Sequence, residues 1–154
     1  MTARILLVTG SRAFASTTHD APRDRAQALL VAFCDIVAPS LIVCGDAEGP
    51  DDWAAMLAAH RNLDLRVYGL DGSVSDGGRV LRRWIPAREP GHRFNPLDRN
   101  HAMVAETQAQ RARGAHVELF AIEAAWSSTK GTAHTIAIAR RWSLATTHVL
   151  ITIT

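Results

Sequence analysis

RILLVTGSR, residues 4–12, is an apolar run that stops at a glycine-bearing turn. No polar residue interrupts the run from Ile5 to Val8, whereas a strand with one face in water would alternate apolar and polar side chains. The pattern therefore predicts a strand that is buried on both faces, as in a parallel sheet covered by helices. Gly10 would stand at the carboxyl end of this strand, where the chain turns toward a helix.

The segments that follow alternate between helix and strand patterns. Apolar residues recur at helical spacing over residues 22–37, with a proline in the first turn and another just past the end. Strand patterns occur at residues 40–44 and 63–70, on either side of a helical segment at 53–60. The first half of the chain thus reads strand, helix, strand, helix, strand, which by the connection rules predicts a doubly wound parallel sheet.

The second half of the chain repeats this alternation after a long irregular segment. Helices are predicted at residues 98–113 and 132–142, and strands at 115–122 and 147–153, the last with the partial alternation of an edge strand. We expect one α/β domain over residues 1–154. Its doubly wound, mainly parallel sheet should have about five strands, with helices on both faces.

The irregular segment, residues 71–97, is rich in arginine, glycine and proline. We expect an inserted loop here, with a short helix at residues 78–84. Its arginines would suit a solvated loop, an anion-binding lid or a nucleic-acid surface; they are Arg79, Arg82, Arg83, Arg88 and Arg93. The formal net charge of the chain is only +2, which favours the loop or the lid over a nucleic-acid surface.

The composition indicates a globular protein that needs no disulfide or metal staples. The chain has 154 residues, of which 47% are hydrophobic and 21% are charged. Cys34 and Cys44 lie in apolar surroundings without CxxC spacing, which favours buried free thiols. The histidines lack HxH or HExxH spacing, so a metal site is not expected. The N-terminal apolar run is too short for a signal peptide or a membrane span, which predicts a cytoplasmic protein without membrane contact.

A second stretch, AWSSTKGTAHT at residues 125–135, gathers hydroxyl groups, one lysine and one glycine between a strand pattern and a helix pattern. The N-terminus of a helix offers unpaired N–H groups and positive dipole to an anion, so we interpret this stretch as a phosphate-binding turn. An ordinary helix cap would use the same serine and threonine residues. In a parallel sheet, this turn, residues 10–12 and residues 45–52 would meet on one rim, and their convergence favours a ligand site.

Four motifs in order resemble the SLOG superfamily of Rossmann-like proteins, and its YspA-like branch in particular. They are VTGSR at residues 8–12, CGDAEGPDDWA at 44–54, FNPLDRNHAMV at 94–104 and WSSTKGTAHTIAIAR at 126–140. The superfamily also contains the LOG phosphoribohydrolases and the DprA core. The resemblance implies a Rossmann-like domain that binds a nucleotide or nucleotide derivative and forms a homodimer or a higher homo-oligomer. We expect no cofactor.

The resemblance also implies which residues contact the ligand. Arg99 would pair with a phosphate or stabilise charge during glycosidic cleavage, although a surface ion pair with Asp98 or Glu106 would suit it too. Asp46 stands where the family has a second glycine, and its carboxylate would repel phosphate but could accept a hydrogen bond from a ribose. The implied ligand-binding residues are Gly10, Ser11, Arg12, Gly45, Asp46, Glu48, Gly49, Asp51, Arg99, Asn100, Ser127, Ser128, Lys130, Gly131 and Thr132.

In the LOG phosphoribohydrolases the phosphate-binding motif ends in a glutamate that acts with the arginine, whereas this chain has Thr135 at that position. Glu123, or Asp51 and Asp52, would have to replace that carboxylate, so the catalytic candidates are Arg99 and Glu123. We therefore expect a sensor or ligand-binding domain for an AMP-type or ADP-ribose-type ligand. An N-glycosidase acting on nucleoside 5′-monophosphates is the alternative, and DprA-like nucleic-acid binding is the third hypothesis.

Overall fold

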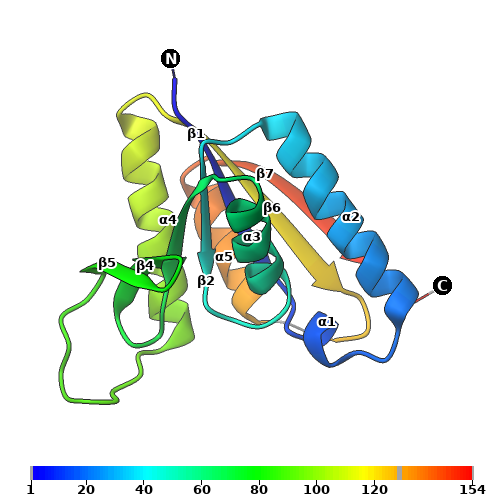
Figure 1. Cartoon of the computed structure of the whole chain (residues 1–154), viewed down its shortest axis with the longest axis horizontal. Coiled ribbons are helices and arrows are strands. Elements are labelled where there is room, and N and C mark those ends of the chain that lie inside the picture. The colour runs from blue at the N-terminus through cyan, green and yellow to red at the C-terminus, as the bar shows by residue number, and fades with distance from the viewer. Residues whose placement is uncertain (1, 128–129, 154) are drawn as a thin grey trace.

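β1 (Arg4–Gly10) lies between β2 and β6 in a sheet to which the described residues contribute seven strands, in the order β5-β4-β3-β2-β1-β6-β7 (Figure 1). This computed structural model describes residues 2–127 and 130–153. The other strands are β2 (Leu41–Gly45), β3 (Asp64–Tyr68), β4 (Ser73–Asp76), β5 (Arg79–Arg83), β6 (His116–Ala124) and β7 (Ala145–Ile151). The helices are α1 (Ala13–Ser16), α2 (Asp20–Val37), α3 (Pro50–His60), α4 (Pro96–Ala112) and α5 (Lys130–Arg141). The α/β class is confirmed, but the sheet has seven strands where the sequence predicted about five.

Five of the strands are parallel, in the order β3-β2-β1-β6-β7. The chain builds outward from β1 to β2 and β3, and then crosses to the other side of β1 for β6 and β7. Backbone pairing runs along the whole of β1, from Arg4 opposite His116 to Gly10 opposite Ile122. The strand order therefore reverses between β1 and β6, and ligands of doubly wound sheets bind at the carboxyl end of such a reversal.

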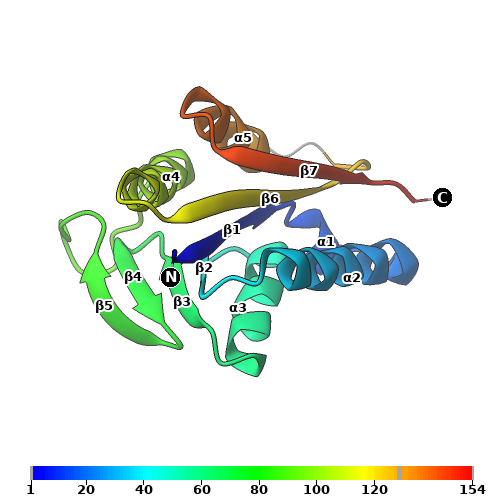
Figure 2. The ribbon, with the colours of Figure 1, turned by 90° about the horizontal axis from the view of Figure 1, so that it is seen from above.

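Helices cover both faces of the sheet because the side chains of β1 alternate between two apolar clusters. Leu6 and Val8 pack with residues of α2 and α3, whereas Ile5 and Leu7 pack with residues of α4 and α5. Figure 2 shows α2 and α3 on one side of the sheet and α4 and α5 on the other. Burial on both faces explains why the run at residues 5–8 contains no polar side chain.

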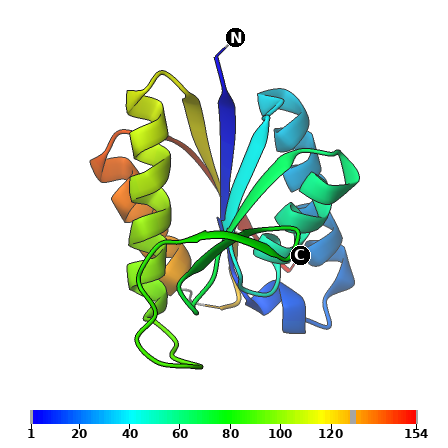
Figure 3. The same ribbon diagram turned by 60° about the vertical axis from the view of Figure 1, so that its left-hand side comes forward.

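The segment at residues 71–97 contains an antiparallel hairpin, so the short helix predicted at residues 78–84 is wrong. β4 pairs with β3 and with β5. Gly77 and Gly78 join β4 to β5 with φ angles of +57° and +87°. A two-residue turn whose twist matches the strands needs positive φ at both positions, which glycine adopts without strain. Figure 3 brings this hairpin and the loop that follows it to the front.

The helix boundaries differ from the predicted ones mainly at the N-termini. α3 and α4 each begin at a proline, Pro50 and Pro96, earlier than the sequence predicted. Asn95 caps α4, because its side chain accepts a hydrogen bond from the backbone N–H of Leu97 at 2.8 Å. β7 is an edge strand, as its partial alternation predicted. Among the described residues, no helix is long and apolar enough to cross a membrane.

Candidate functional site

A pocket of about 490 Å³ opens at the carboxyl end of β1, where the strand order reverses. Its wall comes from the end of β1, the start of α1, the turn before α3, and the first turns of α3, α4 and α5. The lining residues are Thr9, Gly10, Arg12, Ala13, Ala47, Asp51, Asn95, Pro96, Leu97, Arg99, Asn100, Met103, Ser127, Lys130, Gly131 and Thr132. A pocket of this volume can hold a small-molecule ligand.

Many of the residues that the sequence predicted for the site lie together around this pocket. They are Gly10, Arg12, Asp51, Arg99, Asn100, Ser127, Lys130, Gly131 and Thr132. Other predicted residues lie outside its lining, namely Ser11, Gly45, Asp46, Glu48, Gly49 and Glu123. Ser128, also predicted, lies outside the described residues. The three turns therefore converge, but only some of their side chains face the pocket.

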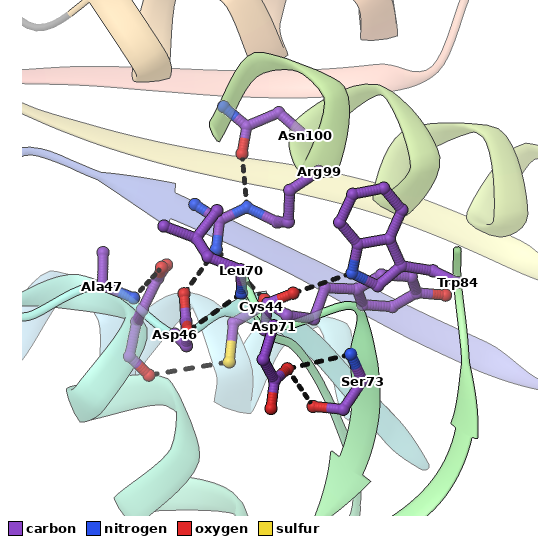
Figure 4. Close-up of polar contacts among 12 residues, drawn as sticks. Cys44, Asp46, Ala47, Leu70, Asp71, Ser73, Trp84, Arg99 and Asn100 are labelled. Atoms are coloured by element: carbon purple, nitrogen blue, oxygen red, sulfur yellow. Dashed lines mark hydrogen bonds and ion pairs between the residues drawn. The ribbon is translucent and has the colours of Figure 1, made fainter. Parts of the chain in front are cut away.

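Arg99 is a buried arginine whose guanidinium joins three parts of the rim (Figure 4). Nη1 donates to Oδ1 of Asp46 at 2.7 Å and to the carbonyl oxygen of Tyr68 at 3.0 Å. Nε donates to Oδ1 of Asn100 at 2.8 Å. Within the described residues, Nη2 has no hydrogen-bond acceptor. Arg99 thus forms its ion pair with Asp46, and Nη2 is the guanidinium nitrogen without a partner among the described residues.

Asp46 offsets the charge of Arg99 and fixes the neighbouring turn. Its Oδ1 accepts from Arg99, and its Oδ2 accepts from the backbone N–H of Leu70 at 3.1 Å, just before β4. Both carboxylate oxygens of Asp46 therefore have hydrogen-bond partners within the protein, and Asp46 does not line the pocket. This geometry does not support the predicted contact between Asp46 and a ribose.

Asp46→Asn should strengthen anion binding about three- to tenfold, because the charge of Arg99 would no longer be offset within the protein. The amide oxygen of the new side chain can still accept from the N–H of Leu70. Titration calorimetry with inorganic phosphate would measure the affinity. Glu48→Gln removes an exposed carboxylate from the same turn and serves as the matched control, with little expected change. Weaker binding in Asp46→Asn than in the wild-type protein would contradict this assignment.

Asn100 connects Arg99 to the start of α5. Its Oδ1 accepts from Arg99, and its Nδ2 donates to the carbonyl oxygen of Gly131 at 3.3 Å. The side chain is therefore engaged at both ends, although Asn100 lines the pocket. We interpret Asn100 as a positioning residue that fixes the guanidinium of Arg99 relative to the turn before α5.

Asp51 is a buried carboxylate in the pocket wall, only 7% exposed. Its Oδ2 accepts a hydrogen bond from the backbone N–H of Ala47 at 3.1 Å. Burial raises the pKa of Asp51 to about 7, against the opposite effect of the Arg99 charge. A Cβ on Gly45 would lie 2.6 Å from Nη1 of Arg99 and 2.7 Å from Oδ2 of Asp51. Glycine at residue 45 therefore lets the arginine and the carboxylate pack against the same stretch of backbone.

The N-terminus of α5 is the part of the rim best suited to an anion. α3 and α4 carry acidic residues in their first turns, whereas the first turn of α5 has none. In the described part of the chain, Lys130 and Arg12 have no ion-pair partner, and the hydroxyl of Thr132, a residue only 2% exposed, has no hydrogen-bond partner. Two cations, one hydroxyl and the N-terminus of α5 thus line one pocket without a partner among the described residues.

Ser11 and Glu123 have structural partners at the rim. Ser11 is fully buried, and its hydroxyl accepts from the backbone N–H of Ala124 at 3.0 Å, which ties the turn after β1 to β6. Glu123 lies 3.4 Å from Nε2 of His148 on β7. Neither lines the pocket, so the geometry does not support Ser11 as a ligand contact or Glu123 as the catalytic carboxylate.

The tryptophans near the rim are packed within the protein and do not line the pocket. Trp84 donates its indole N–H to the carbonyl oxygen of Gly69 at 2.8 Å and packs against Phe94. Trp126 packs edge-on against Phe14. Core packing therefore explains both rings.

Two of the five arginines of residues 71–97, Arg82 and Arg83, help to fix the hairpin and the loop after it. Arg82 forms an ion pair with Glu106 on α4, and Arg83 donates to the carbonyl oxygens of Asp71 and Ile85. None of the five arginines in this segment lines the pocket. The anion-binding lid and the nucleic-acid surface stay predictions.

Part of the pocket wall was missed by sequence reasoning. Thr9 lines the pocket next to the predicted Gly10, and Asn95, Pro96 and Leu97 line it from the start of α4. The pair Asn95-Pro96 is a helix-start signal, with a capping residue followed by proline, and it could have moved the predicted start of this helix from residue 98.

Comparisons of this chain with family models, with curated proteins and with solved structures gave no match. A function is therefore inferred from the pocket and from the four sequence motifs. The resemblance to the SLOG superfamily stays an expectation from those motifs.

Proposed function

We propose that this protein binds a phosphorylated nucleoside or a nucleotide derivative, of the AMP or ADP-ribose type, in the pocket at the carboxyl end of β1. The observation that carries the proposal is the placement of Arg12, Lys130 and Thr132 around one pocket at the N-terminus of α5. Phosphate oxygens accept hydrogen bonds from such groups, and the helix dipole favours their negative charge. Asp51 and Nη2 of Arg99 would contact the ribose.

The SLOG-like motifs support the same assignment, and the missing glutamate favours binding over turnover. Thr135 replaces that glutamate, and its hydroxyl donates to the carbonyl oxygen of Gly131 at 3.0 Å within α5. A sensor or ligand-binding role therefore comes first in the proposal. A cytoplasmic location is part of it, in line with two buried free cysteines. The proposal also includes a homo-oligomer, on the family resemblance alone.

Titration calorimetry with AMP, ADP-ribose, NAD and cyclic nucleotides tests the proposal. Thr132→Val and Lys130→Ala should each weaken binding about 10- to 100-fold, because each removes a hydrogen bond to a charged phosphate. Thr135→Val is the matched control for Thr132→Val, since both threonines are buried in α5 but Thr135 does not line the pocket. Arg141→Ala, at the other end of α5, is the control for Lys130→Ala. The absence of binding to every ligand of the panel would rule out the proposed function.

N-glycosidic cleavage of a nucleoside 5′-monophosphate is the second candidate. It is favoured by one observation, a buried carboxylate of near-neutral pKa, Asp51, in the same pocket wall as Arg99. Release of free base from AMP, lost in Arg99→Ala but kept in Glu123→Gln, would support it. Tight AMP binding without release of base would leave only the binding function.

A further inference from the structure

We infer that Asp51 takes up a proton when the pocket binds an anion, which couples the affinity for that anion to pH. The inference rests on the proposed anion site and adds a regulation that binding alone does not require. Asp51 lines the same pocket as Arg12, Lys130 and Thr132, the groups that would attract the anion. An anion held by those groups would lie in the same pocket as a buried carboxylate, and two negative charges in one pocket repel each other.

The groups around Asp51 leave its charge poorly balanced. On α4, the guanidinium of Arg99 favours the carboxylate form, but Arg99 is already paired with Asp46. Asp46 and Asp52 disfavour the carboxylate form from the turn before α3 and from α3 itself. On β2, burial raises the pKa of the Cys44 thiol, which is therefore neutral. In the described part of the chain, no cation forms an ion pair with Asp51.

In the free protein, the carboxylate of Asp51 is already partly protonated near neutral pH. The carboxyl of Asp51 has its pKa near 7 because it is buried, so it is partly neutral at physiological pH. An anion in the same pocket disfavours the carboxylate further and raises the pKa of Asp51 in the complex. At pH values between these two pKa values the complex holds more protons than the free protein, so binding takes up a proton there.

Affinity for the anion should therefore fall as the pH rises. Below about pH 7, Asp51 is neutral before the ligand arrives, and the affinity is at its maximum. Above about pH 7 the proton must be taken up on binding, and the affinity falls by up to about tenfold per pH unit until the pKa of the complex is reached. Asp51→Asn is neutral at every pH and should bind with an affinity that does not change with pH.

Titration calorimetry with sodium sulfate tests the inference, because sulfate remains a dianion near neutral pH and exchanges no proton itself. Measurements near pH 8 in two buffers of different ionisation enthalpy count the protons taken up per sulfate. We expect a measurable uptake of up to one proton in the wild-type protein and none in Asp51→Asn. Asp52→Asn is the matched control and should behave as wild type, because Asp52 is exposed and does not line the pocket. Lys130→Ala should abolish the binding heat, which assigns that heat to this pocket.

Two results would overturn the inference: sulfate binding without proton uptake in the wild-type protein, or uptake that persists in Asp51→Asn. Nucleotide binding can fail separately. If sulfate binds with proton uptake while AMP and ADP-ribose do not bind, the proposed ligand is wrong and the proton coupling stands. If neither sulfate nor any nucleotide binds, both proposals are wrong. An NMR titration of the Asp51 carboxyl gives a second readout, since its pKa should be higher with sulfate than without it.

Discussion

Gly10→Ala should lower the free energy of unfolding by about 3 kcal/mol, because the end of β1 has no room for a methyl group. A Cβ on Gly10 would lie 2.3 Å from Cγ of Pro50 and 2.8 Å from the carbonyl oxygen of Ile122. Neither atom is the far end of a flexible side chain. Pro50 begins α3, and Ile122 is the β6 residue paired with Gly10. The methyl group would therefore force α3 away from β1 and distort the pocket wall.

Urea denaturation followed by far-ultraviolet circular dichroism would measure this loss. Gly131→Ala is the matched control, because Nδ2 of Asn100, 3.7 Å away, is the nearest atom to a Cβ there among the described residues outside the local backbone. That distance is an ordinary contact, and alanine favours helix more than glycine does, so the control should be as stable as wild type or slightly more stable. Equal free energies of unfolding for Gly10→Ala and the wild-type protein would contradict the close packing at this position.

The parallel part of the fold was predictable because its signals are local and repeated. Each buried strand is a short apolar run and each helix has apolar residues at helical spacing, so the order of elements followed from pattern alone. The hairpin was missed because β5 is exposed along its whole length and its sequence, RVLRR, has no buried face to produce a pattern. Its remaining signal was the pair Gly77-Gly78 between two short runs, which is typical of a two-residue hairpin turn.

The location of the pocket was predictable, but the contacts of several rim residues were not. The position of a turn at the carboxyl rim depends on topology, which the sequence pattern supplied. The partner of a side chain depends on what other elements bring near it. Asp46 accepts a hydrogen bond from Arg99 on α4, and Ser11 accepts one from the backbone N–H of Ala124 on β6. No spacing in the sequence encodes either contact.

Two residues that differ from the SLOG motifs, which the sequence resembles, bear on the charge balance of the pocket. Asp46, in place of a glycine, offsets the charge of Arg99 inside the protein. Thr135, in place of a glutamate, removes a negative charge from α5. Among the described lining residues, Asp51 is then the one acidic side chain, and Arg12 and Lys130 line the same pocket. This balance favours a pocket that holds an anion over one that cleaves it.

Asp51→Asn should raise the free energy of unfolding near pH 8 by about 2–4 kcal/mol, because it removes a charge that is buried without an ion pair. In the wild-type protein burial raises the pKa of Asp51 from 3.8 to about 7. The native state therefore favours the neutral carboxyl over the carboxylate. The protonated Asp51 contributes its full stability only at pH values below the pKa that this side chain has in the unfolded chain. As the pH rises from about 4 to about 7, the unfolded chain loses this proton first, and stability falls by about 1.4 kcal/mol per pH unit. The asparagine variant keeps an acceptor for the N–H of Ala47. Its stability does not fall in this pH range through the titration of residue 51.

The difference between the two proteins should therefore grow with pH in a defined way. Urea denaturation near pH 4 should give free energies of unfolding that differ by less than about 1 kcal/mol, because Asp51 is then neutral in the native state and still close to half neutral in the unfolded chain. Near pH 8 the variant should be the more stable protein. Other titrating groups are shared by both chains and cancel in the difference. Asp52→Asn, which alters an exposed carboxylate in the same helical turn, should show no such pH-dependent gain. A variant that is less stable than wild type near pH 8 would mean that the charged carboxylate of Asp51 stabilises the turn before α3 by more than its burial costs.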